Sequence, residues 1–253
     1  MPCRRGRGRR RAQGHVRETG TVMTIRIRHG SVAALAEQAP SPSTWMSESE
    51  CARVRSTHAA TRRAQFIAGR WLARVLLSEA MGGSWHDWTL TAEDDAPPRV
   101  SGPATASAFP SATLSLSHSG DLVACALGTA PLGIDVEACT PRKGLDALYD
   151  AVTTADERRA LAAHLGTDTL QCFLHAWTLK EAGLKREGDG LFATMLGHAL
   201  QLEAATDPPR ANACTWQLDG HVLALSAEAL GTCTLPGFPP PRYWKLARHT
   251  SSR

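Results

Sequence analysis

Residues 131–137 read Pro131-Leu132-Gly133-Ile134-Asp135-Val136-Glu137, a short apolar stretch that carries two carboxylates. Ile134 and Val136 are β-branched, as strands prefer, and Asp135 and Glu137 alternate with them. In a strand, residues i and i+2 face the same side of the sheet, about 6–7 Å apart along the chain. The stretch therefore predicts a strand whose two apolar side chains point into the core while its two acids share another surface.

Two carboxylates side by side repel each other, and burial increases the cost of that repulsion. A bound divalent cation relieves it, and a ligand set made only of oxygens suits Mg²⁺, with Mn²⁺ as the alternative. A strand face exposed to water also accommodates two acids without any ligand. On this stretch alone, both interpretations stay open.

A third carboxylate lies on the helix that the sequence predicts over residues 168–187. The apolar arc of this helix consists of Leu170, Phe173, Leu174, Trp177 and Leu184. With Phe173 at zero and about 100° per residue, Glu181 falls near 80°, inside the arc. Lys185 falls near 120°, at one edge, and Lys180 near −20°, at the other. An ion pair of Glu181 with Lys185 explains the lysine. A cation shared with Asp135 and Glu137 also explains why Glu181 faces inward.

Ser117-His118-Ser119 stands at the end of a predicted strand, directly before a tight turn. Hydroxyls, an imidazole and backbone N–H groups at a turn suit a phosphate oxygen. Ser117 and His118 cannot easily form a hydrolase dyad, because adjacent strand residues point to opposite faces. The chain also contains no G-x-S-x-G and no G-x-x-x-x-G-K-[ST] pattern.

The rest of the chain divides into two halves that repeat one order of elements, split near residue 130. In the first half, a capping box at residues 47–50 precedes a short helix, a long helix 59–78, a strand with a Pro-rich loop at 88–102, and a hairpin at 112–128. In the second half, a capping box at 154–157 precedes the helix 168–187, a strand with a loop at 198–210, and a hairpin at 214–230 that turns at Asp219-Gly220. This order predicts an α+β fold of two similar, pseudo-symmetric lobes, each a helix pair packed on a small, mostly antiparallel sheet.

Charge is unevenly distributed along the 253 residues, 43% of which are apolar. Residues 1–22 hold seven Arg and one Glu, so the net charge of +4 leaves about −2 for the remainder. The body of the protein is therefore nearly neutral, which argues against a nucleic-acid-binding surface. No apolar run approaches the roughly 20 residues that a membrane span needs. The basic head is either an arm that binds polyanions or an upstream extension before a true start at Met23.

These features predict four regions: a basic, disordered or non-native head (1–22), an N-terminal lobe (23–130), a C-terminal lobe with most of the metal site (131–235) and a flexible tail (236–253). The seven cysteines show neither a disulfide framework nor a C-x-x-C spacing, so a reducing cytoplasm fits best. Two halves already supply an interface within one chain, so we expect a monomer.

Together, these motifs resemble the 4′-phosphopantetheinyl transferases of the two-lobed type that activates surfactin synthetase. That family carries an S-H-S turn, a G-I-D-[IV]-E strand and a W-x-x-K-E-x-x-x-K helix in this order. Here they stand at residues 117–119, 133–137 and 177–185, and the resemblance spans about residues 45–230. One departure is Ala96-Pro97-Pro98, where relatives often have Gly-Lys-Pro.

The resemblance implies transfer of 4′-phosphopantetheine from coenzyme A to a serine of an apo acyl or peptidyl carrier protein, with release of 3′,5′-ADP. It implies that Asp135, Glu137 and Glu181 bind Mg²⁺. It further implies phosphate contacts for Ser117 and His118, and places for Lys180 and Lys185 at the reacting phosphate. Glu181, directly or through water, would take the proton of the carrier serine, and Lys185 would neutralise or protonate the leaving group.

The basic helix 62–74 resembles the part of the family that holds the 3′-phosphate and adenine end of coenzyme A, with Arg63 and Arg70 as its candidate contacts.

Two other functions use some of the same residues. A Mg²⁺-dependent phosphohydrolase or nuclease would use the acids on another phosphate and would form product without a carrier protein. A non-catalytic module that binds carriers would use the acids as a docking surface. That module leaves Lys185 and His118 unexplained, and its acidic surface would repel carriers, which are usually acidic.

Overall fold

The computed structural model describes residues 25–93, 97–103, 112–188, 200–230 and 240–248. Its α-helices are α1 (Val32–Gln38), α2 (Glu48–Ser56), α3 (Ala60–Met81), α4 (Leu145–Val152), α5 (Ala155–Leu165) and α6 (Thr169–Glu187). The strands are β1 (Arg26–Ser31), β2 (Thr89–Leu90), β3 (Val100–Ser101), β4 (Thr113–Ser119), β5 (Leu122–Gly128), β6 (Leu132–Ala138), β7 (Leu200–Ala204), β8 (Ala213–Leu218), β9 (His221–Ala227) and β10 (Arg242–Arg248). Helix α3, the hairpin β4–β5, helix α6 and the hairpin β8–β9 all fall where the sequence predicts them.

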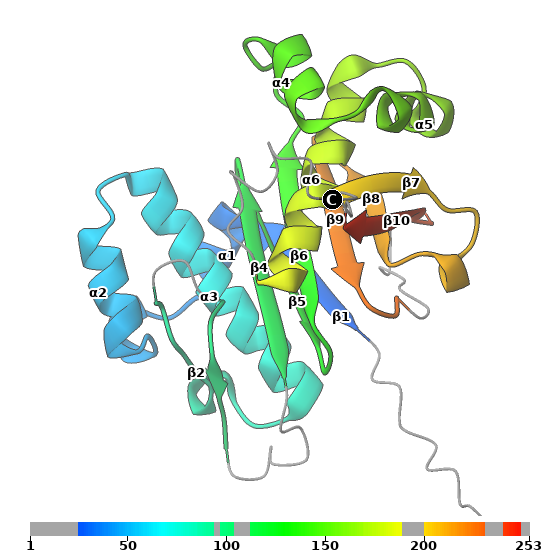
Figure 1. The fold of residues 1–253 in the computed structure, drawn as a ribbon. Coiled ribbons are helices and arrows are strands. Elements are labelled where there is room, and N and C mark those ends of the chain that lie inside the picture. Colours follow the sequence, from blue (N-terminus) through cyan, green and yellow to red (C-terminus); the bar gives the residue numbers. More distant parts are fainter. Residues whose placement is uncertain (1–24, 94–96, 104–111, 189–199, 231–239, 249–253) are drawn as a thin grey trace, which may run out of the picture.

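Two sheets, each with its own helices, confirm the predicted α+β fold of two lobes (Figure 1). Within the described residues, the N-terminal sheet has the order β1-β5-β4 and the C-terminal sheet the order β6-β9-β8-β10-β7, with every pair antiparallel. A small two-stranded sheet joins β2 and β3. The N-terminal sheet is complete at Gly128 and β6 begins at Leu132, so the chain passes from one lobe to the other near residue 130.

The same ion-pair device recurs in both lobes and supports their pseudo-symmetry. Glu50 closes the capping box of α2. Its buried carboxylate accepts two hydrogen bonds, of 2.7 and 3.0 Å, from the guanidinium of Arg74 in α3. Glu157 closes the capping box of α5 in the same way and pairs with Lys180 of α6 at 2.9 Å. In each lobe, the third residue of a short helix thus fixes a cation of the following long helix.

The long helix of each lobe packs across its sheet: α3 covers β5 and α6 covers β6 and β9. Gly133 explains how closely α6 can approach β6. A Cβ atom at this position would lie 2.0 Å from the carbonyl oxygen of Ala182 and 2.7 Å from the amide nitrogen of Arg186. Only glycine permits this contact, and it brings the last turns of α6 over the strand that carries Asp135 and Glu137.

Among the described residues, buried apolar side chains form three clusters, one of which joins the two lobes. One fills the N-terminal lobe between α3 and its sheet, around Trp71 and Leu77, and a second lies between α6 and the C-terminal sheet, around Phe173 and Trp244. The third joins residues of β5 to residues of β6, β8 and β9. Its largest fully buried side chain is Trp216, which lies among buried alanine, valine and leucine side chains. The lobes therefore share a core, which keeps their relative placement fixed.

The expectation of a flexible tail over residues 236–253 is wrong for residues 242–248. These residues form β10, which lies between β8 and β7 in the C-terminal sheet. The physical reason is a strand period of two in the middle of β10: Trp244 and Leu246 are buried on one face, whereas Lys245 and Ala247 on the other face are exposed. The predicted basic head (1–22) and the rest of the tail lie outside the described residues.

None of the helices that the structure describes combines the length and the apolar character that crossing a membrane requires.

Protonation of a buried histidine should make the stability of this fold depend on pH. His175 of α6 is 3% exposed, its Nδ1 lies 3.0 Å from Oγ1 of Thr215, and burial lowers its pKa to about 4. The unfolded chain, with an ordinary histidine pKa, binds more protons between these two values, so stability is lost as pH falls from about 6.5 toward 4. We expect this residue to contribute about 2 kcal/mol of lost unfolding free energy between pH 7.5 and pH 5.

Urea unfolding of wild type and His175→Gln at both pH values measures this contribution. The variant should show a smaller loss than wild type, whereas His58→Gln, at an exposed ring, should keep the wild-type loss. Equal pH dependence in wild type and His175→Gln would contradict the assignment.

Candidate active site

Asp135 lies in the middle of β6, is 2% exposed, and has its two carboxylate oxygens in different environments. Oδ1 accepts two hydrogen bonds of 2.7 Å, one from the hydroxyl of Ser117 and one from the charged Nζ of Lys185. Oδ2 is buried and has no hydrogen-bond partner among the residues that the structure describes. A buried carboxylate oxygen without a partner is costly, so this atom marks a place for a ligand.

Glu137 repeats this arrangement two residues along the strand. Its Oε2 accepts the hydroxyl of Ser119 at 3.0 Å and the guanidinium of Arg142 at 2.6 Å. Both bonds go to the same oxygen. Each strand carboxylate is thus held at one oxygen by a serine of β4 and by one cation.

Glu181 approaches the same place from α6, as its position on the apolar arc predicts. Its carboxylate lies 4.0 Å from Nζ of Lys185. Burial, followed by the negative charge of Asp135, raises the pKa of Glu181 to about 8. A buried carboxyl group beside another carboxylate holds its proton unless a cation replaces it.

The three acids are not arranged as a ready-made metal site. Among the residues that the structure describes, no three His, Cys, Asp or Glu side chains form a group that could hold a metal ion as they stand. Lys185 and Arg142 neutralise the strand acids instead. The unpartnered Oδ2 of Asp135 and the raised pKa of Glu181 nevertheless fit a hard divalent cation, which prefers oxygen ligands.

The structure does not bring Lys180 to these acids, in contrast to the expectation from the sequence. Its Nζ bonds the carbonyl of Val152 at 2.6 Å and the carboxylate of Glu157 at 2.9 Å, and the side chain is 1% exposed. Burial lowers the pKa of Lys180, and the charge of Glu157 opposes that shift. Lys180 lies on the side of α6 that faces α5, so it has a structural partner and no access to the acids.

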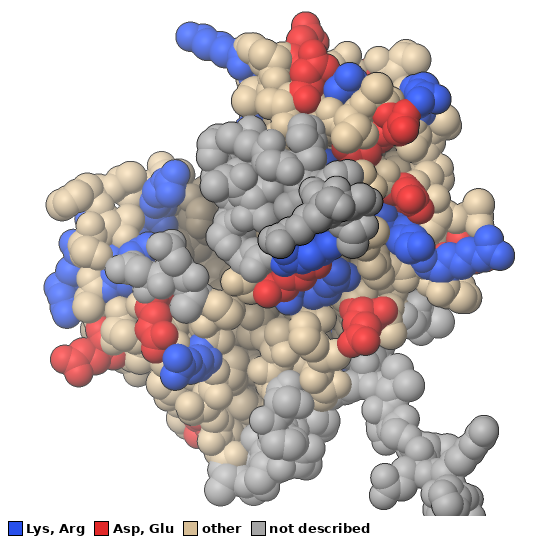
Figure 2. Space-filling model, in the orientation of Figure 1, with Lys and Arg blue, Asp and Glu red and all other residues tan. Residues whose placement is uncertain are grey.

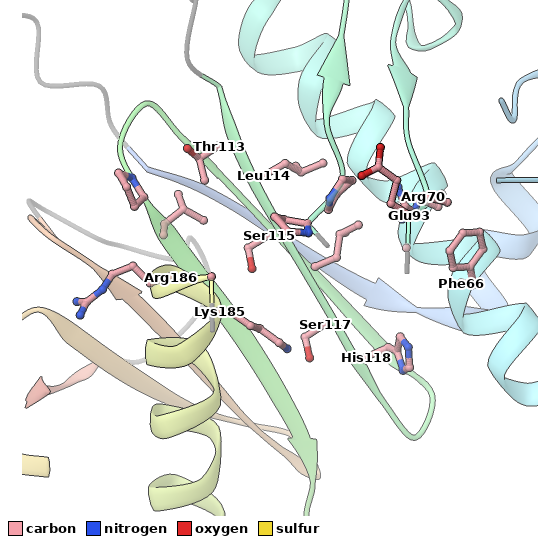
Figure 3. A pocket seen from close by; sticks show the side chains of 18 of the residues that line it. Phe66, Arg70, Glu93, Thr113, Leu114, Ser115, Ser117, His118, Lys185 and Arg186 are labelled. Carbon is pink, nitrogen blue, oxygen red and sulfur yellow. The ribbon is translucent and has the colours of Figure 1, made fainter. Parts of the chain in front are cut away.

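A cavity of about 830 Å³ opens between the two lobes, beside the carboxylates (Figure 3). Its wall takes Phe66 and Arg70 from α3, Ser117 and His118 from β4, and Lys185 from α6. In Figure 3, Lys185 extends from α6 toward Ser117, while His118 lies on the side nearer Phe66. This volume is within the range of small-molecule sites, and Lys185 stands where the cavity meets the carboxylates.

The candidate arginines of α3 differ in their relation to this cavity. Arg70 lines it, although its guanidinium also donates to the carbonyl of Thr91 at 2.6 Å. Arg63 is exposed and does not line it. On the face that Figure 2 shows, acidic and basic side chains meet near the middle of the molecule, where the end of α6 lies in Figure 1.

Two basic residues near the site were not predicted from the sequence. Arg142 binds Glu137 from the loop after β6, and Arg53 of α2 lines the cavity. The signal for Arg142 was a basic pair, Arg142-Lys143, five residues after the second acid of the strand. Helix α2 offers no comparable signal, because only the packing of α2 beside α3 brings Arg53 to the cavity.

Comparison with known proteins gives consistent matches. Residues 131–230 match a family model described as the 4′-phosphopantetheinyl transferase superfamily. The chain is 31% identical over 179 residues to the 4′-phosphopantetheinyl transferase AcpT of Salmonella typhi. The aligned region covers 68% of this chain and 81% of that protein. The chain is also 38% identical over 84 residues to the 4′-phosphopantetheinyl transferase psf-1 of Bacillus pumilus. This aligned region covers 33% of this chain and 35% of that relative's length.

Among solved structures, the acyl carrier protein synthase of Mycobacterium tuberculosis matches with a TM-score of 0.32 and 24% identity, over 42% of this chain and 95% of that one.

Proposed function

Because the chain belongs to the 4′-phosphopantetheinyl transferase family, we propose that it transfers 4′-phosphopantetheine from coenzyme A to a serine of an apo acyl or peptidyl carrier protein. The observation that supports this proposal is the contact of Lys185 with Asp135 and Glu181 beside the cavity between the lobes, with Glu137 two residues farther along β6. The arrangement matches what phosphoryl transfer requires, since that chemistry rests on positioning and charge neutralisation.

Asp135, Glu137 and Glu181 would hold a Mg²⁺ ion, or Mn²⁺ in its place. The ion would supply charge neutralisation and orientation for the pyrophosphate of coenzyme A. The support for this assignment is the donor set, which consists of oxygens only, together with the unpartnered Oδ2 of Asp135.

In the reaction, the hydroxyl oxygen of the carrier serine bonds to the phosphorus that bears pantetheine, and the bond from that phosphorus to the bridging oxygen of 3′,5′-ADP breaks. Glu181, directly or through a water, receives the serine proton. Lys185 lies between the carboxylates and the cavity, where its ammonium can neutralise or protonate the departing oxygen. A positioned base of this kind contributes about 10²–10⁴-fold to the rate.

The cavity would take coenzyme A. His118 and Arg70 line it and offer contacts to phosphate oxygens, and Phe66 adds an apolar surface for the adenine end. The resemblance-based contact for Arg63 has less support, because this side chain is not part of the cavity wall.

We further propose a monomer that works in a reducing cytoplasm. The core between the two sheets already supplies the interface that a symmetric dimer would otherwise provide. Among the described residues, Cys51, Cys125, Cys139, Cys172 and Cys214 are free thiols, which agrees with that compartment.

The test combines the protein with coenzyme A, Mg²⁺ and a panel of apo carrier domains, followed by intact-protein mass spectrometry. We expect one carrier or more to gain the mass of one phosphopantetheine, with an equal amount of 3′,5′-ADP. Removal of the metal with EDTA should abolish the gain, and added Mg²⁺ should restore it. Hydrolysis of coenzyme A in the absence of any carrier, with no carrier modified, would instead identify a phosphohydrolase.

A further inference from the structure

The two sheets meet along β4 and β6 without backbone pairing, and serine hydroxyls fill the gap. The amide of Ile134 donates to Oγ of Ser115 at 3.0 Å, and that of Val136 to Oγ of Ser117 at 3.2 Å. A third bond of 3.1 Å runs from the amide of Ala138 to Oγ of Ser119. The register advances by two residues on both strands, so β4 and β6 run parallel here, and we name Ser115, Ser117 and Ser119 the serine seam.

The seam solves a problem that β6 would otherwise have. On its far side β6 pairs with β9, so its other edge would present unpaired amide groups between the lobes. Buried amides need acceptors, and each serine provides one. The carbonyl of Ile134 on the same edge accepts Nζ of Lys185 at 3.2 Å. The edge is thus satisfied by side chains instead of by another strand.

Two of the three serines also hold a carboxylate. The hydroxyl of Ser117 donates to Asp135 at 2.7 Å and that of Ser119 to Glu137 at 3.0 Å. A hydroxyl has a single hydrogen. Ser117 has given that hydrogen to Asp135 while accepting from an amide, so it has no donor left for a phosphate oxygen. Each of these hydrogen bonds fixes one oxygen of the carboxylate and does not occupy its other oxygen.

We propose that Ser117 and Ser119 are positioning residues, which orient Asp135 and Glu137 for the cation while the whole seam joins the lobes. This inference rests on the proposed function, since it assigns the serines to the same site. It replaces a phosphate contact by Ser117 with a role that acts through Asp135, and it gives Ser119 a role of its own. Partners that orient metal ligands typically change metal affinity 10–100-fold when they are removed.

Ser115 provides a matched control within the same strand. It accepts an amide as Ser119 does, but the residue that precedes its amide partner is Gly133, which has no side chain to orient. Ser115→Ala therefore removes one bond of the seam and nothing from the acids. Ser119→Ala removes one bond of the seam and the hydrogen bond to Glu137.

The experiment measures the affinity of wild type and variants for Mn²⁺, in the presence of coenzyme A, together with urea unfolding. We expect both alanine variants to lower the unfolding midpoint by similar amounts. Only Ser119→Ala should weaken Mn²⁺ binding, by about tenfold. Ser119→Thr keeps a hydroxyl and should return the affinity to within about twofold of wild type. Ser117→Ala repeats the comparison independently at Asp135.

Mn²⁺ affinities that are equal in Ser119→Ala and Ser115→Ala would overturn the orienting role and leave the proposed function in place. If wild type binds no Mn²⁺, both the metal assignment and the orienting role fail. An increase in the KM for coenzyme A in Ser117→Ala, with Mn²⁺ affinity unchanged, would return Ser117 to a phosphate contact and overturn the proposal for that residue.

Discussion

Asp135→Asn should lower kcat/KM for carrier modification by about 10³-fold and leave the fold intact. Asparagine has the same shape and keeps an oxygen that can accept the hydroxyl of Ser117. It removes the negative charge from the strand acid whose Oδ2 is buried and has no partner within the described part of the chain. Cation assistance to phosphoryl transfer amounts to several kcal/mol, and each 1.36 kcal/mol is a factor of ten.

The measurement is single-turnover transfer to one carrier, with circular dichroism and urea unfolding on the same preparation. Asp146→Asn, an exposed acid of α4, serves as the control and should transfer at the wild-type rate. Wild-type activity in Asp135→Asn would show that the strand acids do not take part in the reaction and would remove the central support for the proposed function.

The sequence was most informative where one local rule dominates. Capping boxes gave the starts of α2 and α5, and Asp219-Gly220 gave the turn between β8 and β9. The alternation of Asp135 and Glu137 with β-branched residues gave β6 and its two acids on one strand. The apolar arc of α6 placed Glu181 inward, where the structure has it near Lys185.

Other features depend on partners that are distant in sequence. Strand β10 was missed because its basic residues and the prolines before it resemble a tail, and only the sheet that receives Trp244 makes it a strand. The role of the serine seam depends on β6 lying beside β4, a pairing of lobes that strand patterns do not specify. The sequence alone does not predict that the hydroxyl of Ser117 donates to Asp135, because this contact requires β4 and β6 to lie side by side.

The geometry of the predicted helix already indicates that Lys180 and Lys185 serve different sites. On the helical wheel, Lys180 and Lys185 lie about 140° apart, so both cannot point to one site. The capping-box glutamate of α5 was predicted from the sequence, but its second role as a partner of Lys180 was not. The pseudo-symmetric pair of Glu50 and Arg74 shows that such a partner belongs to the architecture of each lobe.

Lys180→Met should therefore lower the unfolding free energy by about 3–5 kcal/mol, because it leaves the buried carboxylate of Glu157 without its cation. The same change removes the donor to the carbonyl of Val152, which ties the end of α4 to α6. The measurement is equilibrium unfolding in urea. The double variant Glu157→Gln/Lys180→Met should recover most of the loss, because the amide carries no charge and can still accept from the amide of Leu202.

Lys185→Met separates structural from chemical roles of the two lysines. The Lys185 side chain is 20% exposed and lies between the acids and the cavity, so its loss should lower the rate of transfer strongly. It should also lower the unfolding free energy, because the buried carboxylate of Asp135 loses its cation. The rate of transfer therefore separates the two variants: at a temperature and urea concentration where both remain folded, Lys180→Met should transfer well above the rate of Lys185→Met. A Lys180→Met protein with the wild-type unfolding midpoint and no transfer would contradict the structure and support the catalytic role that the resemblance implied.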